Sequence, residues 1–388
     1  MTGVALQHEQ LSLACGGPSD LGVDGIDSLA SLPYRREPYC RRNWGHPFHA
    51  MCSYPSKIKP GIAHFLVRLF TKPGESVLDP FCGVGTIPFE ACNQGRQGFG
   101  SDLNPLAATV THAKVAPPSR HEVEELLAEV ESAVHARPNG ALVEEEIASF
   151  FHRATLAEVI AARTVLLHAS QCEADQRRRA AAFLLSCLAH ILHGNRPYAL
   201  SRRSHNVIPI APKGEFVYKP VLPPLREKVN RLMAVPLSAS FRTGAAACLP
   251  FAHASAFVKQ VDHVITSPPF LGTTHFVRQN RVRLWLCGWD YGFQEEVKPH
   301  FLEHQRGLEA YSVIFETFTR VIRKTGSCVL HLGVVKNVDM AAAIAPYALQ
   351  AGFAVEGIVY ENAAHLETHG RTDRGGTHSH QFLALRKN

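Results

Sequence analysis

The stretch that decides the fold is Ser76-Val77-Leu78-Asp79-Pro80-Phe81-Cys82-Gly83-Val84-Gly85-Thr86. Its apolar beginning predicts a short strand over 76–80, and the residues after the glycines predict a helix over 86–95. Glycines in the turn between them let a ligand approach the backbone at the helix N-terminus. The stretch therefore predicts the strand, turn and helix that open a dinucleotide-type βαβ unit.

A second strand is expected at 97–100, and the acidic residue Asp102 follows it. A carboxylate at this distance from the glycine turn can hold the hydroxyls of a ribose. Pro88 stands where the third glycine of a G-x-G-x-x-G fingerprint belongs. A nucleoside ligand without phosphates therefore fits this turn better than a nicotinamide dinucleotide does.

A second motif, Thr266-Ser267-Pro268-Pro269-Phe270, follows an apolar strand. Two prolines cannot continue a strand, so the turn is stiff and its carbonyls face a cleft. The Ser267 hydroxyl and the Pro268 carbonyl can accept hydrogens from the exocyclic amino group of a base that stacks on Phe270. The absence of a cysteine after the prolines argues against methylation of cytosine at carbon 5, which needs a thiolate nucleophile.

Together, the motifs at 79–86 and 266–270 resemble the two signatures of S-adenosylmethionine-dependent DNA amino methyltransferases. The resemblance implies an α/β fold of the Rossmann-like class I methyltransferase type. Its sheet would have seven mostly parallel strands and a helical insert, and it would end in an antiparallel hairpin formed by 353–361 and 380–386. The implied cofactor is S-adenosylmethionine, and the implied partner is double-stranded DNA with the target base flipped out. Serine before the prolines favours cytosine N4 over adenine N6.

The resemblance also assigns individual residues. It implies that Ser267, Pro268, Pro269 and Phe270 are catalytic. The cofactor-binding residues that it implies are Ser56, Lys57, Asp79, Pro80, Phe81, Gly83, Gly85, Thr86, Asp102, Leu103 and Asn104. The segment 243–250 lacks the acidic residue that contacts the cofactor adenine in this family. We therefore expect backbone and apolar contacts to recognise the adenine.

The chain divides into four parts along its length. Residues 1–50 form a partly flexible basic and aromatic arm, and residues 51–116 form the cofactor-binding half of the methyltransferase domain. Residues 117–235 form a helical insert, and residues 236–388 form the catalytic half. Helical periodicity within the insert predicts helices over 121–136, 143–170, 176–193 and 225–234.

Two groups of basic and aromatic residues are candidates for nucleic-acid binding. The loop at 194–205 contributes Arg196, Tyr198, Arg202 and Arg203, and a later helix contributes Arg278 and Arg281. Arginine side chains can contact phosphates and read guanine, and tyrosine can stack on a base. The alternatives are a solvated loop and a helix beside the core with a solvated basic side.

Composition fits a large enzyme without membrane spans. The chain has 388 residues, 46% of them hydrophobic, and a net charge of +6, which permits nucleic-acid binding without requiring it. We expect a cytoplasmic, nucleoid-associated protein with a cognate restriction system as a partner. Four histidines lie at 365–380 in a glycine-containing connector, but their spacing matches no standard ligand set, so no metal is expected.

Two other functions remain open. The motif at 79–86 also resembles enzymes that methylate tRNA, so the substrate can be an RNA base with an amino group. The chain can also be a non-catalytic nucleic-acid-binding protein with a decayed cofactor pocket. The intact glycines and the intact turn at 267–270 argue against this last alternative.

Overall fold

The computed structural model describes residues 25–136, 143–205, 208–269, 275–304, 307–335, 338–362 and 377–388. Its strands are β1 (Ser76–Asp79), β2 (Gln97–Asp102), β3 (Ala245–Cys248), β4 (Val261–Thr266), β5 (Ile322–Val335), β6 (Val338–Asp339), β7 (Phe353–Asn362) and β8 (Thr377–Lys387). Its α-helices are α2 (Pro60–Phe70), α3 (Thr86–Asn93), α4 (Pro105–Val115), α5 (Arg120–Ala136), α6 (Glu145–Ala148), α7 (Arg153–Ser170), α8 (Asp175–Leu192), α9 (Leu222–Met233), α10 (Ala254–Phe257), α11 (Phe276–Leu286), α12 (Tyr291–Val297), α13 (Ala310–Val321) and α14 (Met340–Gln350).

One sheet runs through the molecule in the order β3-β2-β1-β4-β5-β8-β7. The pairs from β3 to β5 are parallel, and β8 is antiparallel to both β5 and β7. The Rossmann-like class I methyltransferase fold, with its C-terminal antiparallel hairpin, is therefore confirmed. The expected count of seven strands is too low, because the two-residue strand β6 also pairs with β5.

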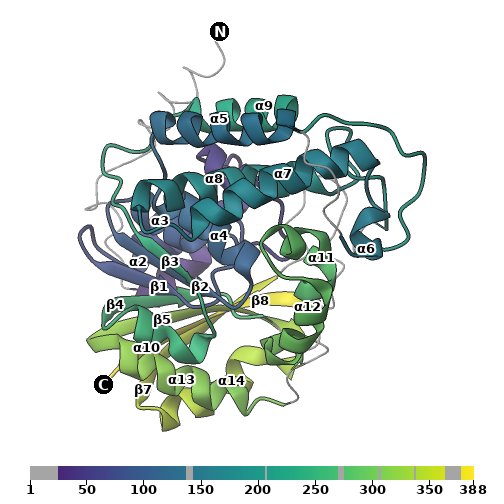
Figure 1. The fold of residues 1–388 in the computed structure, drawn as a ribbon. Coiled ribbons are helices and arrows are strands. Elements are labelled where there is room, and N and C mark those ends of the chain that lie inside the picture. Colours follow the sequence, from purple (N-terminus) through teal and green to yellow (C-terminus); the bar gives the residue numbers. More distant parts are fainter. Residues whose placement is uncertain are drawn as a thin grey trace.

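Helices cover both faces of this sheet (Figure 1). Val77 of β1 and Ile265 of β4 pack in the cluster that includes α2, whereas their neighbours Leu78 and Val264 pack in the cluster that includes α13. Successive side chains of a strand point to opposite faces, so a strand covered on both sides is apolar throughout. This pattern explains why the adjacent apolar residues Val77-Leu78 in β1 and Val264-Ile265 in β4 are all buried.

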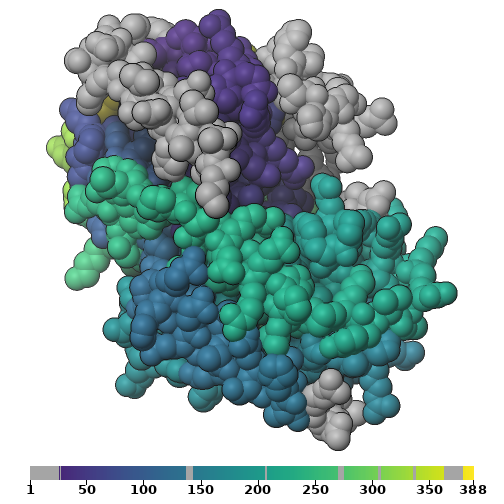
Figure 2. Space-filling model, turned by 90° about the horizontal axis from the view of Figure 1, so that it is seen from above, coloured from purple at the N-terminus to yellow at the C-terminus, as the bar shows by residue number. Residues whose placement is uncertain are grey.

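The helical insert shares a core with the cofactor-binding half. Leu106 and Val110 of α4 lie in one buried cluster with Phe183 and Leu184 of α8. In Figure 1, α7 and α8 lie over α4, and α5 and α9 lie beyond them. Seen from above, the insert forms a broad surface beside the N-terminal segment (Figure 2). The insert is therefore an added layer on the methyltransferase core.

The helix expected over 143–170 is wrong as a single element. The chain forms the short helix α6, breaks at 149–152 and begins again as α7. Phe150 and Phe151 are buried at this break, and His152 accepts a hydrogen bond from the backbone N–H of Ala154 through Nδ1. Burial of two adjacent aromatic rings, together with this N-terminal cap, stabilises the interruption.

The described part of the N-terminal arm, from residue 25, packs against the core. Tyr34 is buried, and its hydroxyl donates a hydrogen bond to Glu361 of β7. Tyr39 packs edge-on against Trp44 and Phe65. Residues 1–24 lie outside the described ranges. Within those ranges, no helix is long and apolar enough to cross a membrane.

Candidate active site

The carboxyl ends of β1 and β4 meet where the strand order reverses. β1 lies between β2 and β4, and all three strands are parallel. Open α/β sheets bind ligands outside the carboxyl ends of their strands at such a switch point. Asp79 ends β1, Asp102 ends β2 and Thr266 ends β4. The sheet thus brings the two sequence motifs to one edge.

The two glycines of the turn after β1 differ in how closely other atoms approach them. Gly83 and Gly85 both have positive φ angles, of 49° and 66°. A Cβ atom on Gly85 would lie 2.6 Å from Oγ1 and 2.9 Å from Cα of Thr111 on α4. A Cβ atom on Gly83 would meet only the ring of Tyr54, at 3.5 Å. Gly85 is therefore required by close packing, whereas a Cβ on Gly83 would make only ordinary van der Waals contact, so the constraint at Gly83 is its positive φ.

Asp102 is held facing this turn. Its Oδ2 accepts a hydrogen bond from the N–H of Gly83 at 2.9 Å, and its Oδ1 accepts one from the N–H of Asn104 at 2.9 Å. Each carboxylate oxygen retains a further acceptor position, which suits a pair of ribose hydroxyls. Burial raises the pKa of Asp102 to about 6, so the group is mainly ionised at neutral pH.

Asn104 fixes one wall of the cleft. Its buried side chain caps α4 by accepting from the N–H groups of Leu106 and Ala107, and its Nδ2 donates to the Tyr54 hydroxyl at 3.1 Å. The Tyr54 ring stacks on Phe276 with 5.5 Å between centroids and 17° between planes. The wall therefore joins the cofactor-binding half to α11 of the catalytic half.

Asp79 links the two motifs directly. Its Oδ1 accepts a hydrogen bond from Thr266 Oγ1 at 2.6 Å and another from the Phe81 N–H at 3.2 Å. The side chain is 3% exposed, and burial raises its pKa to about 7. Asp79 therefore ties the end of β1 to the residue before Ser267.

Three further predicted residues lie around the same turn. Pro80 is buried, and Thr86 begins α3 with a buried hydroxyl that has no hydrogen-bond partner among the described residues. The ring of Phe81 lies 5.2 Å from that of Phe251. An unsatisfied buried hydroxyl at a helix N-terminus is a group that a bound ligand can satisfy.

The segment that lacks the family's acidic residue lies beside Asp102. The N–H of Leu249 donates to the Asp102 carbonyl at 3.0 Å, and Cys248 Sγ donates to the Leu103 carbonyl at 3.5 Å. Leu103 itself is half-buried. Backbone groups and apolar side chains therefore lie beside Asp102, and their contact with the cofactor adenine stays a prediction.

Ser56 and Lys57 lie on a turn next to Tyr54. Ser56 is exposed and has a positive φ of 54°. Lys57 Nζ donates to the His49 carbonyl at 2.7 Å and to Asn43 Oδ1 at 3.0 Å, and burial lowers its pKa to about 8. The ammonium group is therefore held by the N-terminal segment. Its binding of the cofactor stays a prediction.

Ser267 lies beside His331 of β5. Its Oγ donates to the His331 carbonyl at 3.2 Å and lies 3.3 Å from His331 Nδ1. The hydroxyl has one hydrogen and two acceptor positions. The hydroxyl hydrogen is donated either to the His331 carbonyl or to Nδ1. In both histidine tautomers, at least one acceptor position of Oγ therefore stays free for a substrate amino group.

The rest of the catalytic turn is described only in part. Pro268 is buried and Pro269 is half-buried, and both directly follow β4 as the sequence predicted. Phe270 lies outside the described residues. Its stacking role stays a prediction.

Sequence reasoning missed two side chains at this edge of the sheet. His331 is buried against the ring of His380 at 5.0 Å, and burial holds its pKa well below the usual value, so the ring is neutral. Glu303 is buried, and its Oε1 accepts from the N–H of Phe276 at 3.1 Å. Its Oε2 has no partner among the described residues, and burial raises its pKa to about 7. Neither residue belongs to a short motif, so only the strand register could have indicated His331.

The predicted nucleic-acid-binding arginines fall into two groups. Arg202 donates to the carbonyls of Gly214 and Ser149, and Arg281 pairs with Glu295 and lies over the Tyr291 ring. These two guanidinium groups are engaged within the protein. The members of the second group are exposed: Arg196, Arg203 and Arg278.

Comparison with known proteins found a matching family model and several similar solved structures. A family model described as "RMKL-like, methyltransferase domain" matches residues 49–133, which carry the glycine turn and Asp102. Three solved structures are also similar, each with a TM-score of 0.32. TrmN from Thermus thermophilus is 14% identical over 86% of this chain, which spans 50% of that protein. The rRNA methyltransferase aviRa from Streptomyces viridochromogenes is 12% identical (86% of this chain, 88% of that one), and a TehB-like S-adenosylmethionine-dependent methyltransferase from Corynebacterium glutamicum is 9% identical (84% and 86%). Likeness at this score carries no argument about substrate.

The sheet order, the glycine turn with its facing carboxylate and the family match define a class. The protein is an S-adenosylmethionine-dependent methyltransferase with a Rossmann-like class I fold. The free acceptor positions of Asp102 and the unsatisfied Thr86 hydroxyl fit this cofactor.

Proposed function

We propose that this enzyme methylates the exocyclic amino group of an RNA base. The observation that carries the proposal is the hydrogen bonding of the Ser267 hydroxyl. It donates its hydrogen bond to His331, so its oxygen keeps an acceptor position for the substrate. S-adenosylmethionine supplies an electrophilic methyl group on a sulfonium. Ser267 Oγ and the Pro268 carbonyl accept the two amino hydrogens and so orient the nitrogen lone pair.

RNA is favoured as the substrate by the cofactor-binding half. Residues 49–133 match a domain of RNA-methyltransferase type, and the motif at 79–86 resembles tRNA enzymes as well as DNA enzymes. The family match covers the half that binds the cofactor. The base and its sequence context are left to experiment.

Double-stranded DNA is the second candidate substrate. The serine before the prolines resembles that of cytosine-N4 DNA methyltransferases, with adenine N6 as the other DNA target. A restriction partner and an association with the nucleoid belong to this candidate.

The proposed cofactor contacts follow from the cleft. Asp102 accepts hydrogen bonds from the ribose hydroxyls, and the ligand lies along the glycine turn at Gly83, beside Tyr54. Pro80, Phe81, Leu103 and the 248–251 segment provide backbone and apolar surface for the adenine. Asp79 acts through Thr266, holding the catalytic turn in place.

The decisive experiment compares RNA and DNA of matched sequence. The purified protein is incubated with each nucleic acid and radiolabelled S-adenosylmethionine, and the digested nucleosides are identified by mass spectrometry. We expect an amino-methylated nucleoside from RNA, and the Ser267→Ala variant should lower its formation about 100-fold or more. Methylation of DNA alone would replace the RNA proposal with the DNA candidate. Full activity of Ser267→Ala would overturn the assignment of the amino group.

A further inference from the structure

Among the exposed aromatic rings of the insert, those of Phe216 and Tyr198 are each supported on one face by a neighbouring side chain. The guanidinium of Arg202 lies 4.0 Å from the ring centroid of Phe216, yet Phe216 remains 53% exposed. The ring of Tyr198 stacks on His190 at 5.4 Å with 21° between planes, and Tyr198 remains 43% exposed. Exposed aromatic rings that are already supported on one side present the other side to a ligand.

The two rings lie on segments that hydrogen bonds hold together. Lys219 Nζ donates to the carbonyls of Ala199 and Ser201, so the chain after Phe216 is tied to the chain after Tyr198. Arg202 adds a second link through the Gly214 carbonyl. The rings are therefore held in place before any partner binds, which lowers the entropic cost of binding.

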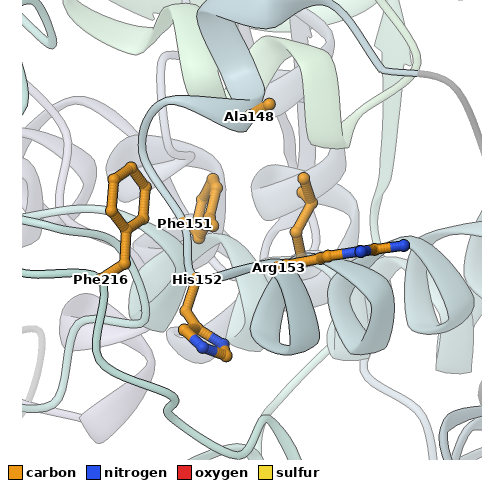
Figure 3. Close-up of a pocket in the computed structure, with 6 residues that line it drawn as sticks. Ala148, Phe151, His152, Arg153 and Phe216 are labelled. Carbon is orange, nitrogen blue, oxygen red and sulfur yellow. The ribbon is translucent and has the colours of Figure 1, made fainter.

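A cavity adjoins the Phe216 ring. It has a volume of about 310 Å³, and its lining includes Phe151, Leu156 and Phe216. In Figure 3, Phe216 and Phe151 lie on one side of the cavity, and the Arg153 side chain extends away on the other side. Aromatic rings therefore border an open, largely apolar hollow against which a flat heterocycle can lie.

The charge around the rings favours an anionic strand. The segment 190–220 contains one acidic residue, Glu215, against five basic ones: Arg196, Arg202, Arg203, Lys213 and Lys219. Glu145 and Glu146 are also exposed on α6, next to the cavity residue Ala148. Such a mixed surface suits a strand held chiefly by its bases better than a duplex held by dense phosphates.

We propose that Phe216 and Tyr198 form a stacking platform that binds unpaired bases of the RNA substrate. The inference rests on the proposed function and deepens it, because it assigns substrate binding to the insert. Stacking on aromatic rings is tolerant of base identity. The platform therefore binds single-stranded RNA near the target base without reading its sequence. The target base itself is recognised by the turn at 267–270.

The test measures binding of a fluorescein-labelled single-stranded RNA of about 12 nucleotides by anisotropy with the full-length protein. Phe216→Ala should weaken binding about tenfold, because stacking is worth about 1–3 kcal/mol per base. Val217→Ala is the matched control, since Val217 is the neighbouring residue, is 55% exposed and has no ring. Phe216→Tyr should retain affinity because it keeps the aromatic face.

Each outcome decides the matter. Equal affinities of Phe216→Ala and Val217→Ala would overturn the platform, as would loss of affinity in Phe216→Tyr. A Phe216→Ala effect on a DNA duplex but not on the RNA would overturn the choice of partner.

Methyl transfer is measured separately. RNA binding that depends on Phe216 without RNA methylation would contradict the proposed function alone, and RNA methylation unaffected by Phe216→Ala would contradict the platform alone.

Discussion

The cofactor edge and the basic loop of the insert show how differently two kinds of predicted site form. At the cofactor edge, the short side chain of Asp102 accepts from the backbone N–H groups of Gly83 and Asn104, which the ends of the neighbouring strands β1 and β2 bring beside it. In the insert, the long side chain of Arg202 donates to the carbonyls of Ser149 and Gly214 on irregular segments. A motif at a strand end can therefore position a carboxylate, but a sequence pattern cannot tell which partner a long side chain in a loop will find.

The arginines of a basic loop can therefore do two different things: bond to carbonyls within the protein, or remain exposed to a ligand. Arg202 closes a loop and supports Phe216, whereas Arg196 and Arg203 of the same loop remain exposed. Arginine has five donors and a long stem, so it satisfies distant carbonyls as readily as phosphates. Four predictions test this contrast between short side chains held at the strand ends and long side chains that reach carbonyls or solvent.

The largest effect is expected from Gly85→Ala at the cofactor edge. The new Cβ would lie 2.9 Å from Thr111 Cα, and the φ of 66° already disfavours a side chain. We expect a loss of about 3–4 kcal/mol in the free energy of unfolding, combining left-handed strain with overpacking. Denaturant titration measures the change.

Gly352→Ala is the matched control for that variant. Gly352 also has a positive φ, of 91°, but no atom lies within 4 Å of its added Cβ. It should cost only the conformational part, about 1–2 kcal/mol. Equal costs for the two variants would show that the close approach of the turn to α4 is unimportant.

The sequence predicted the fold where periodicity and turn chemistry act alone. The strands β1 and β4 and the glycine turn were predicted from apolar residues and breakers, and the final hairpin was implied by the family resemblance. The strand β3, with its sequence Ala245-Ala246-Ala247-Cys248, was missed because alanine has no strand preference. The break at 149–152 was missed because it depends on burial of two phenylalanines against distant helices.

The residues of the candidate site also separate into those that local sequence patterns predicted and those that only the folded structure brings together. Asp79 and Asp102 were predicted because each ends a strand near the glycine turn, and Ser267 because it follows a strand within the second motif. His331 and Glu303 were not, because a lone histidine or glutamate gains meaning only from its spatial neighbours. The register that pairs Thr266 with Leu330 is what sets Ser267 beside His331.

The second prediction concerns Asp79, which joins the two halves of the site. Burial raises its pKa in the folded state to about 7, from about 4 when exposed. The folded state then binds more protons than the unfolded state between these values, so stability falls as pH rises from about 4 to about 7. Asp79→Asn should remove this fall, since the amide oxygen still accepts from Thr266.

The measurement is the free energy of unfolding of both proteins across that pH range. The variant should gain stability relative to the wild type as pH rises and show a constant difference above pH 7 or so. A difference that does not change with pH would show that Asp79 ionises normally. Asp262→Asn is the control, because hydrogen bonds from Ser76 and the charge of Arg323 lower the pKa of Asp262 despite partial burial, so its effect on stability changes only at and below about pH 4 and the difference from the wild type should stay nearly constant over the measured range.

The third prediction concerns His331, which contacts the catalytic hydroxyl. His331→Leu removes the Nδ1 contact to Ser267 and should lower kcat about tenfold, the equivalent of about 1.4 kcal/mol, with little change in KM for the cofactor. His331→Asn places an amide nitrogen near the position of Nδ1 and should restore part of the activity.

His263→Leu is the matched control on the same sheet. His263 contacts Ser327 and Glu75 rather than Ser267, so its loss should affect stability without lowering kcat. Equal kcat losses in His331→Leu and His331→Asn would mean that His331 only fills space.

The smallest effects are expected from two arginines on α11, and they test most directly whether engaged and exposed guanidinium groups differ. Arg281 pairs with Glu295 and covers Tyr291, so Arg281→Ala should cost less than about 1 kcal/mol of stability and leave RNA affinity nearly unchanged. Arg278, three residues earlier, is exposed, and Arg278→Ala should leave stability unchanged. If Arg278 contacts a phosphate, its loss also reduces the dependence of log affinity on log salt by about one unit. Anisotropy titrations at several salt concentrations measure both slopes, and a larger change for Arg281 than for Arg278 would reverse the distinction drawn between the two groups.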